Sequence, residues 1–197
     1  MHFCTRSLAL FLLAMAAYNP VSAQELGFLI WKDQKVVGGI TALRREADKR
    51  TVYAVSSYSE MEIIKKQVVR SSLGLEYRQG KPYACFTSFH LNQALRDSSN
   101  MRMQGDGLDC FIYPNERYRL GSTSQWSTAR MYFEEPIGQN SVFVESALKD
   151  CPLRRISPGM YLLDLPGNRT NTYRYAGGML QEVHVDRPLM KLVFRRA

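Results

Sequence analysis

Residues 160–175 read MYLLDLPGNRTNTYRY, and this stretch sets the architecture expected for the rest of the sequence. Apolar and polar side chains alternate in 160–165 and again in 169–175, which is typical of strands with one buried face. The triplet Pro-Gly-Asn at 166–168 separates the two runs. Glycine and asparagine readily adopt the positive φ that a tight hairpin turn requires. The stretch therefore predicts an antiparallel β-hairpin.

The same period of two recurs on both sides of this hairpin. Further strands are expected at residues 25–31, 35–43, 51–59, 73–78, 82–93, 101–103, 108–113, 117–120, 141–146, 153–157, 179–186 and 189–195. Turn signals separate many of them at intervals of about 8–12 residues, which favours a meander over β-α-β units. The sequence thus predicts a mainly β fold, in which an antiparallel meander forms a curved sheet or an incomplete β-barrel with one short helix.

The short helix is predicted at residues 122–133, STSQWSTARMYF. The segment opens with hydroxyl residues, which are favoured at a helix N-cap. Trp126, Ala129 and Phe133 then recur at helical spacing. A helix that ends before Pro136 would cover an open end or face of the sheet.

Residues 60–70, EMEIIKKQVVR, have a composition that also suits a helix. Two pairs of β-branched residues, at 63–64 and 68–69, fit a pleated surface better than a helix. We therefore expect a strand with a bulge over the whole segment.

The first 23 residues predict a secretory signal peptide. Arg6 is followed by the apolar run 8–17, LALFLLAMAA, and residues 21–23, Val-Ser-Ala, match a small-x-small cleavage site. A membrane anchor would need about 20 apolar residues, so this run is too short to span. Export to the periplasm or beyond is expected, with residues 24–197 forming a single β-rich domain and no transmembrane span after cleavage.

The chain is basic, with a formal net charge of +8. This charge favours anionic partners such as lipid headgroups, polyanions or acidic proteins. The alternative is a β-protein whose outward positions simply carry Lys and Arg. Because no zinc-finger or helix-turn-helix pattern accompanies the charge, a nucleic-acid partner is not expected.

Three cysteines follow the predicted cleavage site: Cys85, Cys110 and Cys151. An odd number permits at most one internal disulfide. The sequence does not choose the pair, although Cys85 and Cys110 fall on nearby predicted strands and are the first choice. Alternatively, all three are small buried apolar side chains.

Aromatic residues recur along most predicted strands, where they would fill or line the concave face of a curved sheet. A packed core is one interpretation. The other is an apolar cavity between sheet and helix that binds a small molecule or lipid. The candidate ligand-binding residues on its floor are Trp126, Met131, Tyr132 and Phe133.

Glu134 and Glu135 form an adjacent carboxylate pair. Neighbouring strand residues point to opposite faces, so the two carboxylates do not easily converge on one substrate. We interpret Glu134, Glu135 and Pro136 as a structural motif in which one glutamate accepts hydrogen bonds from Arg130 or Arg174. Ligand contact and catalysis are the less favoured alternatives.

No catalytic residue, metal site or cofactor is predicted. After the cleavage site only His90 and His184 remain, and a metal or nucleophilic centre needs more partners than these offer. The glycine-rich phosphate loops and the G-x-S-x-G elbow are missing from the sequence.

Residues 131–144, MYFEEPIGQNSVFV, resemble the signature of a domain-of-unknown-function family of secreted proteins from Bacteroidetes-type bacteria. Residues 163–175 and 178–183 are similar to two further stretches of that family, whereas His184 and Cys151 depart from its pattern. The resemblance implies a β-rich architecture and an exported protein, but no activity. The overall plan also resembles periplasmic half-barrel lipoprotein carriers, an analogy of fold alone.

Three functions follow from these observations. The first is a non-enzymatic envelope protein that binds an apolar or lipid-like ligand in a half-barrel groove. The second is an envelope structural or interaction module that docks another protein through a sheet edge or a basic face. A hydrolase with an unfamiliar site is third.

Overall fold

A computed structural model describes residues 22–62, 65–187 and 190–197, and their strands form one antiparallel sheet. In chain order the elements are β1 (Ser22–Lys32), β2 (Lys35–Ala47), β3 (Arg50–Glu62), β4 (Lys66–Arg78), β5 (Lys81–Leu91), β6 (Ala94–Gln104), β7 (Gly107–Ile112), β8 (Glu116–Leu120), the 3-10 turn η1 (Arg130–Tyr132), β9 (Ser141–Val144), β10 (Lys149–Ser157), β11 (Met160–Leu165), β12 (Arg169–Ala176), β13 (Met179–Arg187) and β14 (Met190–Arg196).

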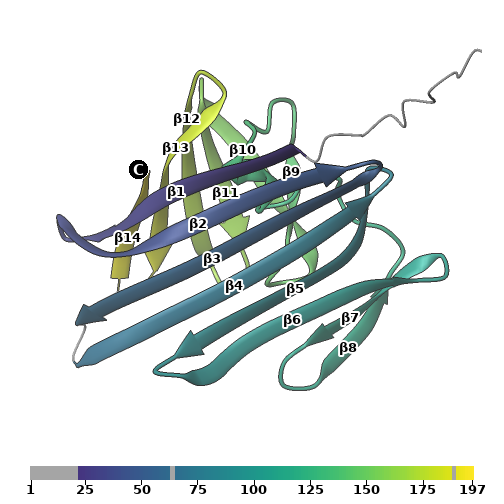
Figure 1. The fold of residues 1–197 in the computed structure, drawn as a ribbon, viewed down its shortest axis with the longest axis horizontal. Helices are drawn as coiled ribbons and strands as arrows, with labels where there is room; N and C mark the ends of the chain where they lie inside the picture. The colour runs from purple at the N-terminus through teal and green to yellow at the C-terminus, as the bar shows by residue number, and fades with distance from the viewer. Residues whose placement is uncertain (1–21, 63–64, 188–189) are drawn as a thin grey trace, which may run out of the picture.

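The sheet is a circular meander with one break. The strand order is β8-β7-β6-β5-β4-β3-β2-β1-β14-β13-β12-β11-β10-β9, so each strand pairs with its sequence neighbours, β1 pairs with β14, and β8 does not pair with β9. We call the gap between β8 and β9 the seam. Figure 1 shows β1–β8 as one curved layer, the N-terminal half, with β9–β14, the C-terminal half, crossing behind it. The predicted fold class, an antiparallel meander that forms an incomplete barrel, is confirmed.

The hairpin that opened the sequence analysis is β11–β12. Its turn places Gly167 at φ 74° and Asn168 at φ 52°, the left-handed region that these two residues tolerate best. On the strands, alternation sends every second side chain inward: Leu26, Phe28 and Ile30 of β1 are buried. The alternation of apolar and polar residues along a strand thus gives it one buried and one exposed face.

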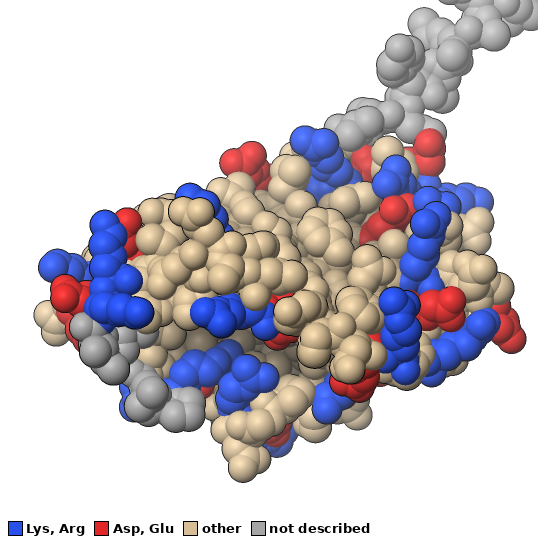
Figure 2. Space-filling view, turned by 90° about the horizontal axis from the view of Figure 1, so that it is seen from below, with Lys and Arg blue, Asp and Glu red and all other residues tan. Residues whose placement is uncertain are grey.

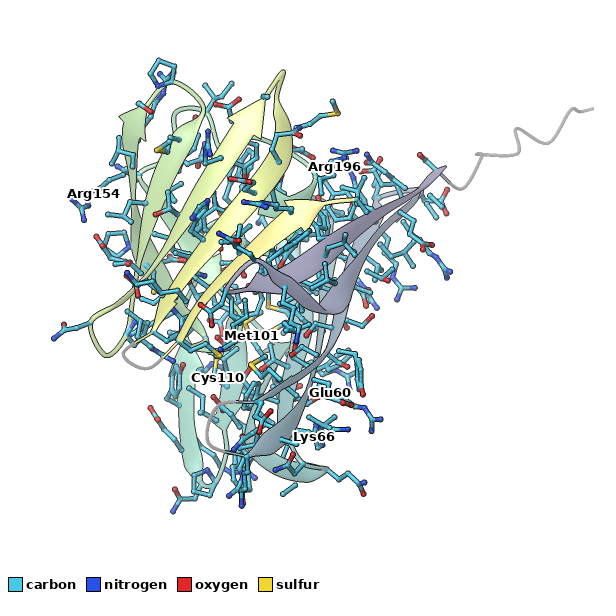
Figure 3. All side chains as sticks on the ribbon, turned by 90° about the vertical axis from the view of Figure 1, so that its left-hand side faces the viewer. Glu60, Lys66, Met101, Cys110, Arg154 and Arg196 are labelled. Atoms are coloured by element: carbon cyan, nitrogen blue, oxygen red, sulfur yellow. The ribbon has the colours of Figure 1, made fainter. Side chains whose placement is uncertain are left out.

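The core lies between the inner faces of the two halves. Phe28, Leu75 and Met101 from the N-terminal half and Leu163 and Leu180 from the C-terminal half are at most 1% exposed. In Figure 3, Met101 lies in the interior between the halves, while Glu60 and Lys66 lie on the outside of the sheet. The two halves therefore share one hydrophobic core.

The helix predicted at 122–133 is wrong, because only the three-residue turn η1 forms there. Backbone hydrogen bonds within the segment are confined to residues 127–133, and two further backbone bonds join the segment to β9. The amide of Thr128 donates to the carbonyl oxygen of Phe143 at 3.0 Å. The amide of Phe143 donates to the carbonyl oxygen of Trp126 at 2.7 Å. A bridge between Ser127 and Phe143 accompanies these bonds. The adjacent strand thus supplies the partners that a helix would have provided internally.

The single bulged strand predicted at 60–70 is also wrong. β3 ends at Glu62 and β4 begins at Lys66, and these two residues face each other across the antiparallel pair. The amino group of Lys66 lies 2.5 Å from a carboxylate oxygen of Glu60. The segment therefore contains a chain reversal, with opposite charges on its two arms.

The first-choice disulfide is wrong, since Cys85, Cys110 and Cys151 are all free and buried. Cys85 on β5 and Cys110 on β7 both pair with Met101 on β6. A whole strand thus separates them, roughly 10 Å by strand spacing, beyond the roughly 7 Å between Cα atoms that a disulfide bridges. The remaining interpretation, small buried side chains, fits all three residues.

The predicted signal peptide falls almost entirely on residues 1–21, which lie outside the described residues. β1 starts at Ser22, two residues before the predicted mature start. Within the part of the chain that the structure describes, no helix has the length and apolar character that crossing a membrane requires.

Candidate functional site at the seam

The four candidate ligand-binding residues lie together on the segment that connects β8 to β9. This segment enters the interior, and we call its residues 126–133 the plug. Met131 is fully buried and Phe133 is 8% exposed. The Tyr132 ring meets Phe28 edge-on at 5.3 Å between centroids, and the hydroxyl of Tyr175 donates to the carbonyl oxygen of Met131 at 2.7 Å. The plug thus fills part of the interior, and other residues line the cleft described below.

A buried carboxyl that the sequence analysis missed holds the plug in place. Glu145 is fully buried in the turn after β9. Its Oε1 accepts from the amide of Ala129 at 2.9 Å, its Oε2 accepts from the hydroxyl of Thr128, and its carbonyl oxygen accepts from Oγ of Ser99 at 2.7 Å. Burial raises the pKa of this carboxyl above its usual range. The only sequence signal was an acid directly after the apolar run VFV.

The Glu-Glu-Pro motif joins the plug to both halves of the sheet. Glu134 accepts from Nη2 of Arg130 at 2.7 Å and lies 2.9 Å from Nη1 of Arg44 on β2. Oε1 of Glu135 accepts from the hydroxyl of Tyr161 on β11 at 2.8 Å. The two carboxylates therefore have separate partners and do not converge on one point.

Replacing Glu134 with glutamine should lower the free energy of unfolding by about 1 kcal/mol, because two partly exposed guanidinium groups lose a shared counter-charge. Urea titration measures this change. Glu25→Gln, on an exposed residue of β1 for which the structure gives no ion pair, is the matched control. Equal stability of the two variants would show that the bridge contributes nothing.

The two histidines among the described residues lie in different halves. His90 is on β5, opposite Arg70 of β4, and Nε2 of His184 on β13 lies 3.1 Å from Glu182. Among the described residues, no three His, Cys, Asp or Glu side chains are grouped so that they could hold a metal ion.

The seam carries a cleft of about 480 Å³, which we call the seam cleft. Its N-terminal wall consists of Asp97, Ile112, Glu116 and Tyr118, and its C-terminal wall of Val144, Ser146, Ala147, Lys149, Leu165, Pro166, Arg169 and Arg187. The side chain of Tyr118 on β8 reaches across the seam, and its hydroxyl donates to the carbonyl oxygen of Leu148 at 2.9 Å. Figure 2 looks at the molecule from below and shows a hollow near the middle of that face, bordered by Lys and Arg side chains.

The walls of the seam cleft combine apolar and charged groups. Five residues provide apolar surface: Ile112, Val144, Ala147, Leu165 and Pro166. The volume falls within the range of about 300–1,000 Å³ typical of small-molecule sites. Sequence reasoning missed this site because its residues come from segments throughout the chain and meet only when β8 approaches the C-terminal half.

These features define the class of protein as a β-barrel-like domain, rolled from one open sheet. Comparison with protein-family models and with curated protein sequences gives no match. A solved structure described as a β-barrel-like protein of domain of unknown function DUF1849, from Brucella abortus, is similar over 90% of this chain and 96% of that one, at 10% identity and a TM-score of 0.51. This similarity shows the fold alone. It agrees with a β-rich domain of unknown function, but it supports neither the Bacteroidetes-type origin nor the motif at 131–144.

Proposed function

We propose that the protein is exported to the bacterial envelope, where it binds a lipid-like ligand in the seam cleft. The observation that carries the proposal is the position of the only break in the circular meander of described strands. That break coincides with a cleft that has apolar side chains within and charged side chains around it. An amphipathic molecule matches both kinds of surface.

The packing of the plug also supports this proposal. It fills the interior with Met131 and Phe133 and is bonded to β9 and to Glu145. The core is therefore complete without a ligand, and the seam cleft stays outside the packed region.

Native mass spectrometry of protein purified from its own host tests the binding proposal, and a co-purified apolar molecule is the expected result. Ala147→Phe should abolish it, because the ring would occupy the cleft beside Val144. Ala94→Phe, at an exposed position at the start of β6, should leave it intact. Protein that carries no lipid, or that carries it equally in both variants, would contradict the proposal.

Export itself rests on the sequence of the first 23 residues. Recovery of the protein from the periplasm with Gln24 as its first residue would support it. Recovery of uncleaved chain from the cytosol would contradict it.

A second candidate function is docking of an envelope protein at the seam. Of the described strands, β8 pairs through its backbone only with β7, so its other edge is free to accept an added strand. A salt-sensitive pull-down partner that is lost when Arg117→Pro is introduced on β8 would favour this function over lipid binding.

A further inference from the structure

The two walls of the seam cleft carry opposite charges. Lys149, Arg169 and Arg187 lie on the C-terminal wall, and Asp97 and Glu116 lie on the N-terminal wall. No ion pair within 4.0 Å joins any of the five to another described residue. The residues outside the described ranges contain no Asp or Glu that could neutralise the cations.

Several arginines outside the cleft, in contrast, form ion pairs. Eight of the fifteen other described arginines lie against carboxylates: Arg44, Arg50, Arg78, Arg119, Arg130, Arg154, Arg174 and Arg195. In the cleft, three cations and two anions line opposite walls without an ion pair between them.

Arg187 is the most constrained of the five charged groups. It is partly buried, and its Nη1 donates to carbonyl oxygens of Asp186 and Thr170 and to Oδ1 of Asn171, at 2.7, 3.3 and 3.2 Å. Its Nε and Nη2 make no hydrogen bond to a described residue. Burial, together with the nearby charge of Arg169, lowers the pKa of this guanidinium. A desolvated cation without a counter-ion is costly, and a bound anion would offset that cost.

The opposite wall offers the complementary feature. Asp97 on β6 and Glu116 on β8 are both exposed and border the same cleft. Because these carboxylates have no cationic partner among the described residues, they are available to an ammonium group placed between the walls.

We infer that the seam cleft recognises a zwitterionic head group, with an anionic phosphate against Arg187, Arg169 and Lys149 and an ammonium against Asp97 and Glu116. Phosphoethanolamine carries this pair of charges, either as a phospholipid headgroup or as the free compound. The inference rests on the proposed function, since the apolar side chains of the cleft would hold the acyl chains.

Calorimetric titration of the full-length protein tests the inference with three probes. They are a short-chain phosphatidylethanolamine below its micelle concentration, the phosphatidylglycerol with the same chains, and free O-phosphoethanolamine. The ethanolamine lipid should bind about 10-fold more tightly than the glycerol lipid, a modest difference for one added charge contact. Free O-phosphoethanolamine should bind more weakly than the lipid that carries it.

Two variants test which residues contact the ammonium and which contact the phosphate. Glu116→Gln should remove the preference for the ethanolamine lipid without weakening the glycerol lipid, and Arg169→Gln should weaken both. Both positions are exposed, and Arg169 makes one hydrogen bond, from Nε to the carbonyl oxygen of Pro166 at 2.8 Å, where Arg187 makes three. Glu25→Gln and Arg155→Gln, at exposed positions away from the cleft, should change neither affinity.

The outcomes separate the two proposals. Equal affinity for the two lipids, or a preference that survives Glu116→Gln, overturns the zwitterion inference and leaves lipid binding standing. Free O-phosphoethanolamine that binds as tightly as the lipid supports the head-group inference and contradicts the role of the acyl chains. A protein that binds none of the three probes overturns both.

Discussion

Replacing Glu145 with alanine is expected to lower the free energy of unfolding by about 3–5 kcal/mol. One buried and one partly buried donor would lose their acceptor, and a cavity would remain where the carboxyl was. The amide of Ala129 and the hydroxyl of Thr128 both donate to this side chain. Their loss detaches the plug from the turn after β9. Urea unfolding at pH 7 measures the effect, and a loss below about 1 kcal/mol, the size of a single ordinary hydrogen bond, would contradict the assigned role.

Glu145→Gln separates hydrogen bonding from ionisation. A glutamine retains the acceptor for the amide of Ala129 and can donate to the hydroxyl oxygen of Thr128, so at a pH of about 4 the variant should be as stable as the native protein. Burial raises the pKa of Glu145 in the folded state. In the native protein, protonation of this carboxyl therefore favours the folded over the unfolded state. That stability is fully present below the unfolded pKa of about 4.3 and is lost as the pH rises through the folded pKa.

The glutamine variant should not show this decline. Its stability relative to the native protein should therefore increase as the pH is raised from about 4 to 7, across the range in which an unfolded glutamate ionises. Parallel pH profiles for the two proteins would show that Glu145 does not titrate abnormally.

Met131→Ala is expected to cost about 2–5 kcal/mol, the range for a fully buried large aliphatic side chain that leaves a cavity. Met131 lies at the centre of the plug and is 0% exposed. Met131→Leu is the matched control, because a volume-conserving change should cost less than about 1.5 kcal/mol. Thermal unfolding of the two variants tests this difference, and equal midpoints would mean that the plug is not part of the cooperative core.

Local patterns predicted the hairpins well. The runs expected at 160–165 and 169–175 are β11 and, to within one residue, β12, because turn residues and alternation act between neighbours in sequence. The helix expected at 122–133 failed for the opposite reason. Trp126 and Thr128 find backbone partners on β9, and no local pattern reports a partner on another strand.

In the candidate site too, contacts between residues close in sequence could be predicted and contacts with distant strands could not. The four candidate ligand-binding residues lie close together in sequence, as do Arg130 and Glu134, so the proximity of each set could be anticipated. The second partner of Glu134, Arg44, comes from β2 and could not. The disulfide choice failed because β6, within which a strand was expected at 101–103, lies between the strands of Cys85 and Cys110. The seam cleft could not be predicted, because it depends on how far the two halves roll toward each other.

The pairing of β1 with β14 gives the sheet a cyclic order whose starting point is arbitrary. Phe28 lies opposite Arg196, and the amide of Ala197 donates to the carbonyl oxygen of Gly27 at 3.0 Å. These two strands are thus a hairpin that lacks only its turn. A circularly permuted gene that supplied this turn and opened at the exposed Gly138 would encode a sheet built entirely from consecutive strands. Among the described strands, the pairing of β1 with β14 is the non-local one and imposes the largest loop-closure entropy. In the permuted chain it would become local.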